Sequence, residues 1–250
     1  MQIIQSNILK RFTNLTHAFT TKDGGISEQP YSSLNLAFHV GDNENNVIDN
    51  HNTLAKKLGY KTRTLVHMKQ IHSSLVKKIN SNDNFNNPPK CDALITDRVD
   101  TPLMVMVADC APILFYDDVK KVIAVAHAGR QGTFLNIIQN VVNSFKNEFN
   151  SNTNDIIVSI GTSIGSCCYE VGQKIINEAK ELGLEYAMTK RENSFYLNIR
   201  KILKTQLRNA GIKEENIEVS SECTCCQNEK YFSYRADGVT GRFCGVIELR

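Results

Sequence analysis

The sequence has no tryptophan, only five prolines and no large excess of charge of either sign among its 250 residues. Its 29 Lys and Arg face 26 Asp and Glu, which gives a formal net charge of +3 with the basic residues scattered along the chain. A protein that binds a nucleic acid polymer usually carries a basic cluster, so we expect no such partner. The 41% hydrophobic content supports a sizeable core and excludes a disordered or fibrous chain.

Long hydrophobic segments are also absent. The longest apolar run, Leu103 to Ala108, is far too short to span a bilayer, and the first residues lack the apolar segment and cleavage site of a secretion signal. We therefore expect a cytoplasmic protein with no membrane partner. In that reducing environment the eight cysteines should be thiols rather than disulfides.

Nucleotide-binding motifs are missing as well, because neither a Walker A nor a G-x-G-x-x-G sequence occurs. Residues 161–165 do match the G-x-S-x-G nucleophile elbow of the α/β-hydrolases. That fold needs a histidine after the serine, whereas all six histidines precede Ser163. We therefore interpret Ser163 as a turn residue.

Hydrophobic periodicity predicts four helices and seven strands. The helices are expected at 47–58, at 134–149 behind a capping Thr133, at 173–182 and at 199–209. The strands are expected at 64–67, 103–107, 113–116, 122–126, 156–160, 217–220 and 243–249. Only short turns separate the second, third and fourth of these strands, so they should pair as antiparallel neighbours. Strands outnumber helices without strict alternation, which favours an α+β fold with a mixed sheet.

Two predicted strands run into a residue that can bind a metal or act as a nucleophile, namely Cys110 and His127. His67 or His72 is a third candidate, but their spacing of five lets at most one of them point into a shared site. One thiolate and two imidazoles suit zinc and leave a fourth tetrahedral position open for water or substrate. In the alternative interpretation, Cys110 is a small buried apolar residue and the histidines are hydrogen-bonded core residues.

The other cysteines give a weaker metal signal. Residues 223–226 contain one C-x-x-C pair, whereas a structural zinc site usually draws on two such pairs. We therefore expect these cysteines to be reduced and free of metal. They are Cys167, Cys168, Cys223, Cys225, Cys226 and Cys244.

With these residues in view, the chain resembles the YfiH-like family, also called laccase-domain or multicopper polyphenol oxidase-like proteins. The matching motifs begin with His17-Ala-Phe-Thr-Thr-Lys-Asp-Gly-Gly, Tyr31-Ser-Ser-Leu-Asn-Leu, His39-Val-Gly-Asp, Gln70-Ile-His72 and Asp92-Ala-Leu-Ile-Thr. They continue with Ala108-Asp-Cys110-Ala-Pro, Val125-Ala-His127-Ala-Gly, Ile160-Gly-Thr-Ser-Ile-Gly-Ser-Cys-Cys-Tyr-Glu-Val-Gly and Phe232-Ser-Tyr-Arg-Ala-Asp-Gly-Val-Thr-Gly-Arg. Together they cover nearly the whole chain.

The resemblance implies one catalytic domain over residues 1–250, an α+β fold whose mixed β-sheets pack as a sandwich flanked by helices. It implies a catalytic zinc on His72, Cys110 and His127, and so selects His72 over His67; copper is less expected. The implied activities are phosphorolysis of adenosine, inosine and methylthioadenosine and deamination of adenosine. The implied partners are a purine nucleoside and phosphate, bound by a monomer or homodimer.

The chain departs from the family pattern near the expected substrate. The family usually reads H-A-G-W-R-G, where this chain has Arg130 and Gln131 in place of Trp and Arg, and His51 stands where the family commonly has Arg. By residue type, candidates for phosphate or ribose contacts are Asn35, His51, Arg130 and Arg235. We therefore expect phosphorolysis to suffer more than deamination, and to weaken as pH rises if His51 binds phosphate.

Two other functions stay open at this point. Cys110 could be a metal-free thiolate nucleophile with His127 as its base, hydrolysing an amide such as a peptidoglycan precursor. The cluster could also belong to a metal-binding module without catalytic activity. Laccase chemistry is not expected, because a coupled copper cluster needs several imidazoles beyond the two in the triad.

Overall fold

Two β-sheets lie face to face at the centre of the computed structural model, which describes residues 1–250. The first sheet has the order β1 (Ile3–Ile4), β2 (Leu15–Thr20), β13 (Phe243–Leu249) and β5 (Leu103–Val107). The second has the order β12 (Ile217–Val219), β8 (Ile156–Ile160), β6 (Ala111–Asp117), β7 (Val122–Ala128), β4 (Ala93–Thr96) and β3 (Val76–Lys78). Its two outer pairs are parallel and its inner pairs antiparallel, so the sheet is mixed.

The central strands are buried on both faces, and successive residues pack into two different hydrophobic cores. In β6, Ile113 and Phe115 belong to the core shared with the helices, whereas Leu114 and Tyr116 belong to the core between the sheets. Successive side chains of a strand point to opposite faces. The strand therefore appears in the sequence as a continuous apolar run rather than an alternating one.

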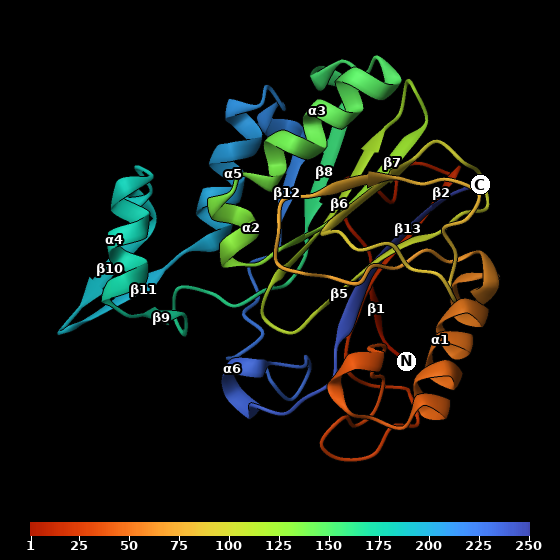
Figure 1. Cartoon of the computed structure of the whole chain (residues 1–250), viewed down its shortest axis with the longest axis horizontal. Coiled ribbons are helices and arrows are strands. Elements are labelled where there is room, and N and C mark those ends of the chain that lie inside the picture. Colours follow the sequence, from red (N-terminus) through yellow and green to blue (C-terminus); the bar gives the residue numbers. More distant parts are fainter.

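Helices cover both outer faces of the sandwich (Figure 1). The six-stranded sheet packs against α3 (Ile137–Phe149), α5 (Ile199–Asn209) and the short α2 (Arg130–Phe134). The four-stranded sheet packs against α1 (Glu44–Leu58), whose Leu54 and Ala55 share a hydrophobic core with residues of that sheet such as Met104 and Val246. The order of layers is therefore helix, sheet, sheet, helix. None of the helices combines the length and apolarity needed to cross a membrane.

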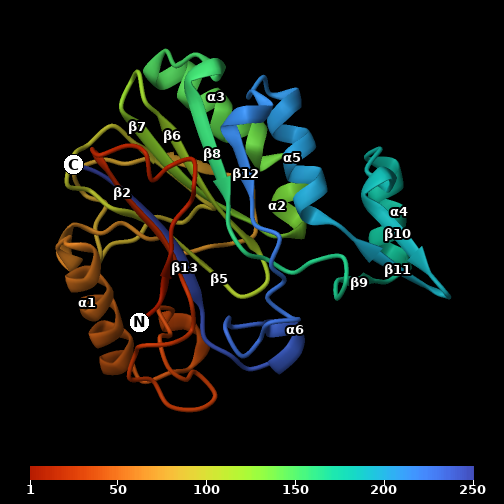
Figure 2. The same cartoon turned by 180° about the vertical axis from the view of Figure 1, so that it is seen from behind.

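A small lobe projects from the sandwich (Figures 1 and 2). It contains α4 (Gln173–Glu181) and a three-stranded sheet with the order β10 (Met188–Arg191), β11 (Ser194–Leu197) and β9 (Glu170–Val171). The last helix, α6 (Tyr234–Asp237), follows β12 and precedes β13. Single 3-10 turns occur at Phe38–Val40, Thr62–Thr64, Thr153–Asp155, Glu185–Ala187 and Glu214–Asn216.

The predicted fold class is confirmed, and the four predicted helices are present, one with the predicted bounds (α5) and three with shifted ends. Thr133 does not cap the long helix, because it lies inside α2. Asn136 caps α3 instead, adopting the left-handed conformation and accepting a hydrogen bond from the backbone N–H of Gln139. The predicted strand at 64–67 is wrong, since Val66 makes only an isolated bridge to Leu103.

The predicted pairing of three consecutive strands is also wrong in one part. β6 and β7 are antiparallel neighbours as expected, but β5 pairs with β13 in the other sheet. Residues 108–110 carry the chain from one sheet to the other, and Asp109 takes a φ of 89° to make the turn. Sequence patterns cannot separate the two arrangements, because a short turn can join strands within one sheet or across two.

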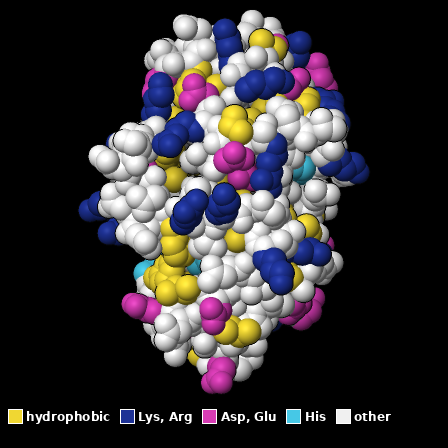
Figure 3. Space-filling view, turned by 90° about the vertical axis from the view of Figure 1, so that its right-hand side faces the viewer, with side chains coloured by type: hydrophobic (Ala, Val, Ile, Leu, Met, Phe, Trp, Pro, Cys, Tyr) yellow, Lys and Arg dark blue, Asp and Glu magenta, His cyan; other side chains and the backbone are white.

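Charge is dispersed on one face of the molecule (Figure 3). On the face drawn in Figure 3, Lys and Arg side chains lie among acidic and neutral polar ones rather than in one continuous patch.

A buried carboxyl group on β13 makes stability depend on pH. Glu248 is 2% exposed, and burial raises the pKa of its carboxyl to about 7 although Arg250 lies 2.9 Å away. In the unfolded chain the group ionises near 4.5, so its favourable contribution is complete below that pH and is lost as pH rises through about 7. We predict that the free energy of unfolding of Glu248→Gln, taken relative to that of the native chain, is larger at about pH 8 than at about pH 5. The difference between the two pH values should be at most about 3 kcal/mol. Urea unfolding at both pH values tests this, with exposed Glu229→Gln as the control; an equal difference at both pH values would contradict it.

Candidate metal centre

Three side chains from distant parts of the sequence meet beside the crossing between the sheets. Cys110 ends the crossing segment, His127 lies near the end of β7, and His72 lies in a turn before β3. Their ligand atoms all lie within 4.8 Å of one another, and the two imidazole rings are 4.9 Å apart and nearly perpendicular. We call this group the His–Cys–His centre.

Backbone conformation and a missing side chain make room for the centre. His72 has a φ of 58°, a left-handed conformation that is uncommon for residues other than glycine. Gly129 follows β7, and a Cβ there would lie 2.8 Å from the Cys110 sulfur and 3.3 Å from the His72 ring. Glycine is therefore required by space at this position, since its φ of −78° is accessible to any residue.

Asp92 holds both histidines in place. One of its carboxylate oxygens lies 2.9 Å from His127 Nδ1 and accepts a hydrogen bond from the backbone N–H of His72. The other accepts from the backbone and hydroxyl of Ser73. Because His127 Nδ1 is occupied by Asp92, Nε2 is the atom left to bind a ligand. A carboxylate behind a metal-binding histidine fixes the tautomer and the ring orientation in this way.

The electrostatics of the centre favour a thiolate. Burial opposes ionisation of Cys110, but the imidazoles of His127 and His72 outweigh it and lower the pKa of the thiol to about 6. Burial likewise opposes protonation of His127, yet the Cys110 thiolate and Asp92 raise the pKa of its imidazole to about 9. Asp92 stays ionised, because hydrogen bonds from His127 and Ser73 overcome burial and lower the pKa of its carboxyl to about 2.

These groups fit a divalent zinc ion. One thiolate and two imidazoles are ligands that zinc prefers, and three protein ligands leave one tetrahedral position free. His72 is exposed and Cys110 is partly exposed, so the group is open to solvent rather than enclosed in the core. Zinc binding would displace the second proton of His127, which makes the affinity depend on pH.

The centre lies in the wall of a cavity of about 340 Å³. This volume falls in the range of small-molecule sites, roughly 300–1,000 Å³. Half of the 18 lining residues are hydrophobic, among them Ile164 and Tyr169, and three arginines also line the cavity. The arginines are Arg130, Arg235 and Arg242.

The three arginines differ in how strongly they are already engaged. Arg130 forms an ion pair of 2.6 Å with Glu178 on α4. Arg235 donates to the backbone carbonyls of Cys168 and Glu170, and Arg242 donates to those of Thr240 and Gly241. No carboxylate pairs with Arg235 or Arg242, so their charge remains available to an anion in the cavity.

The structure places only part of the predicted site at this cavity. His72, Cys110, His127, Arg130 and Arg235 line it, but Asn35 and His51 do not. Asn35 is fully buried, and its amide bonds the chain around it, including Ala37 and Arg242.

His51 is likewise fully buried, and its Nε2 bonds to the carbonyl of Leu36. Burial lowers the pKa of its imidazole to about 3, so it carries no charge for phosphate at neutral pH. The structure therefore gives no support to the expectation that Asn35 and His51 bind phosphate or ribose, nor to the pH dependence expected from His51.

Two functional residues escaped the sequence reasoning. Asp92 lies in the quoted motif Asp92-Ala-Leu-Ile-Thr, but a buried carboxylate behind a histidine has no signature in spacing. Arg242 ends the motif that begins at Phe232, and only the fold shows that it reaches the same cavity as Arg235. Ser163 lies buried outside the cavity and its hydroxyl has no hydrogen-bond partner, so no histidine activates it. It is not the turn residue expected from the sequence, because it forms an isolated β-bridge with Cys223.

Comparisons with known proteins agree with this architecture. Residues 16–250 match the family model described as multi-copper polyphenol oxidoreductase laccase. The purine nucleoside phosphorylase YlmD of Geobacillus stearothermophilus is 33% identical over 251 residues, covering 96% of this chain and 92% of that protein. The purine nucleoside phosphorylase YfiH of Escherichia coli K12 is 31% identical and covers 92% of each chain. The crystal structure of the Bacillus licheniformis hypothetical protein YfiH superposes with a TM-score of 0.91 at 36% identity, covering 94% of this chain and 93% of that one.

The role of Asp92 can be tested by one substitution. We predict that Asp92→Asn lowers zinc affinity by about 10- to 100-fold, because the amide turns one acceptor oxygen into a donor that faces other donors. Zinc affinity is measured by competition with a chromogenic chelator. Asp117→Asn is the matched control, since Asp117 is also fully buried but accepts only from Val119 and Lys120 at the end of β6. Equal affinities for the native chain and Asp92→Asn would show that Asp92 does not orient the ligands.

Proposed function

This chain belongs to the family described as multi-copper polyphenol oxidoreductase laccase, and from that premise we propose that it is a zinc-dependent purine nucleoside phosphorylase. The proposed substrates are adenosine, inosine and methylthioadenosine, each with phosphate. Relatives that match over most of both chains are named purine nucleoside phosphorylases, which supports an enzyme of that kind. We further propose a slower deamination of adenosine at the same site.

The observation that carries the proposal is the pairing of a metal-ligand set with unpaired arginines in one cavity. The His–Cys–His centre, Arg235 and Arg242 all line it. Phosphorolysis needs a cationic cradle that holds phosphate against the sugar and a polar group that stabilises the departing base or the sugar. The apolar side chains of Ile164 and Tyr169 in the same wall suit a purine ring.

In this proposal each residue of the cavity has a distinct role. Arg242 and Arg235 bind and orient phosphate, and their placement costs no reorganisation because backbone carbonyls already fix both guanidinium groups. Asp92 keeps His127 in the tautomer that presents Nε2 to the cavity. When bound, zinc would supply a Lewis acid that polarises a substrate atom or activates a water molecule.

Deamination has weaker support from the cavity. It requires a group that carries protons between the attacking water and the leaving ammonia. Asp109 is the only carboxylate in the cavity wall, and it already accepts hydrogen bonds from Thr224, Ser233 and the backbone of Arg235. This arrangement favours phosphorolysis, contrary to the order expected from the altered residues at 51, 130 and 131.

The oxidase activity in the family description has little support from the donor set. Of the four histidines outside the His–Cys–His centre, His17 bonds Ser6 and the pair His51 and His67 packs with Phe38 and Phe85. Only His39 lines the cavity with the centre. A coupled copper cluster needs more imidazoles than these.

A second candidate function rests on the charges of the centre. A thiol with a pKa of about 6 beside an imidazole with a pKa of about 9 is the pair that a cysteine hydrolase uses.

Metal removal distinguishes the zinc-dependent phosphorylase from the thiol hydrolase. We predict that chelation abolishes phosphorolysis and that stoichiometric zinc restores it, as measured by base release from inosine with and without phosphate. Amide hydrolysis that persists or rises after chelation would instead support the thiol hydrolase.

The arginine assignment predicts an asymmetry between two substitutions. Arg242→Gln should raise the KM for phosphate by about 10- to 100-fold, because a hydrogen bond to a charged group contributes about 1.5–3 kcal/mol. The KM for nucleoside and the deamination rate should change little, since neither involves phosphate. Arg130→Gln is the matched control and should have a smaller effect, because Glu178 already neutralises Arg130. A larger effect at Arg130 than at Arg242 would reverse the assignment.

A further inference from the structure

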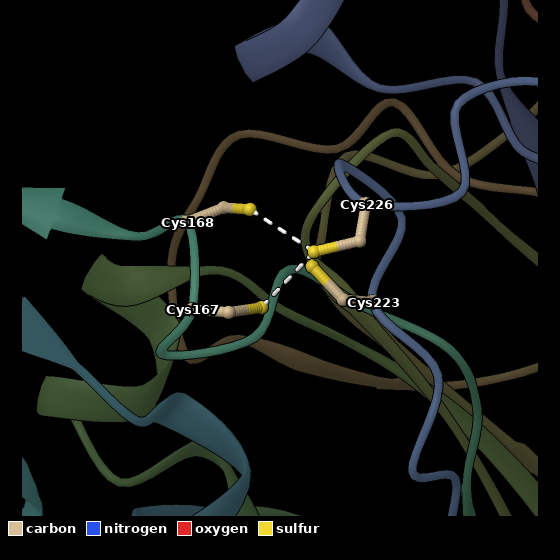
Figure 4. A group of neighbouring side chains, drawn as sticks. All are labelled: Cys167, Cys168, Cys223 and Cys226. Carbon is tan, nitrogen blue, oxygen red and sulfur yellow. Dashed lines mark hydrogen bonds between the residues drawn. The ribbon is translucent and has the colours of Figure 1, made fainter.

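Four sulfur atoms converge at a second place in the molecule, outside the His–Cys–His centre (Figure 4). Two come from the loop between β8 and β9, and two from the loop between β12 and α6. All four lie within 4.8 Å of one another. The residues of this four-cysteine cluster are Cys167, Cys168, Cys223 and Cys226. We propose that the four-cysteine cluster binds a structural zinc ion, whatever reaction the neighbouring cavity performs.

The spacing of the sulfur atoms suits a tetrahedral zinc ion. Zinc–sulfur bonds of about 2.3 Å place tetrahedral ligands about 3.8 Å from one another. The sulfur of Cys226 lies 3.3 Å from those of Cys167 and Cys168, and no pair is farther apart than 4.8 Å. The required distance therefore falls inside the observed range, and small side-chain rotations complete the geometry.

The donor pattern differs from the one that the sequence expectation assumed. That expectation counted a single C-x-x-C pair and therefore left these cysteines free of metal. The adjacent residues Cys167 and Cys168 supply the second pair, because the backbone of Cys168 and Tyr169 turns back onto the carbonyl of Gly165. None of the four is paired in a disulfide, and Cys167 and Cys226 are exposed, so burial in a core does not explain why they gather.

Cationic groups and one backbone donor lie around the cluster. Four thiolates and one zinc ion carry a net charge of −2. Arg191 donates to the carbonyl of Cys167, and Arg235 donates to that of Cys168. The backbone N–H of Gly165 donates to the sulfur of Cys223 at 3.1 Å. A Cβ at Gly165 would lie 2.8 Å from a nitrogen of Arg200 and 3.0 Å from the Cys167 sulfur, so a third guanidinium borders the same loop.

The proposed zinc would fix one wall of the cavity. The first loop carries Ile164 and Tyr169, and the second loop leads into Tyr234 and Arg235, all of which line the cavity. Without a metal the two loops are joined near the cluster by a short backbone bridge from Ser163 to Cys223 and Thr224 and by the hydrogen bond from the Gly165 N–H to the Cys223 sulfur. Arg235 adds hydrogen bonds to the carbonyls of Cys168 and Glu170. A zinc ion on both loops would hold Arg235 and Tyr169 at a fixed separation.

Metal analysis in a Cys110→Ala background tests the proposal apart from the His–Cys–His centre. Protein purified under reducing conditions should retain about one zinc ion per chain in that background by elemental mass spectrometry. Adding Cys226→Ser should remove it. Cys225→Ser is the matched control, because Cys225 lies in the same loop but outside the cluster, and the zinc should remain. Replacement by Co²⁺ should give the intense visible absorption of a thiolate-rich tetrahedral site.

A measurement on the native chain keeps the test decisive if Cys226→Ser does not fold. The four cluster cysteines should resist alkylation until a zinc chelator is added, whereas Cys225 should react at the same rate before and after. Three results overturn the proposal: no zinc in Cys110→Ala, iron in place of zinc, or a disulfide within the cluster in protein kept under reducing conditions. Zinc at the four-cysteine cluster of a native chain that shows no phosphorolysis of inosine would count against the proposed function only.

Discussion

The buried carboxylate of Asp92 is the constraint on which the His–Cys–His centre depends. It is fully buried at the start of β4, and it accepts hydrogen bonds from His127, His72 and Ser73 at once. Removing one donor would leave a buried carboxylate oxygen without its hydrogen bond, which costs free energy. The three donors are therefore held in place together around Asp92. Two histidines that are 55 positions apart in the sequence thereby acquire one fixed geometry. A site whose side chains are fixed by a shared buried group in this way needs little reorganisation when a ligand binds.

The sandwich determines where such a site can form. β5 and β6 are adjacent in sequence but lie in different sheets, so the connection at 108–110 must turn sharply across the gap between them. Cys110 lies on that connection, next to the end of β7 that carries His127. Both sheets are covered by helices on their outer faces, so the edge where the chain crosses is one of the places left open to a small molecule. The cavity beside Cys110 is thus a consequence of the topology.

Sequence alone predicted the mixed sheets, the four longer helices and the residues that meet in the centre, for identifiable reasons. An apolar stripe at three- and four-residue steps predicts a helix with one face packed on the core. The stripe of α3 consists of Ile137, Ile138, Val141, Val142 and Phe145. The resemblance to a known family selected His72 over His67, which the spacing left open. Sequence could not place His51, because the same helical pattern is expected whether the histidine faces a ligand or packs, buried, against the half-buried ring of Phe38. Nor could it pair Cys167 with Cys226, since that contact depends on two loops that follow different strands.

Asp109 connects the two clusters of potential metal ligands. It precedes Cys110 in the chain, and its carboxylate accepts a hydrogen bond from Thr224, the residue after Cys223. The same carboxylate accepts from Ser233 and from the backbone of Arg235 in α6. Because Asp109 sits in a left-handed conformation at the crossing of the sheets, its direction is set by the sandwich rather than by its own partners. The β12–α6 loop is therefore attached to the sandwich at Asp109. Under the zinc proposal it is also attached to the β8–β9 loop at the four-cysteine cluster. These contacts hold the segment from 223 to 235 against the sandwich, and Arg235 lies in the same cavity wall as Cys110.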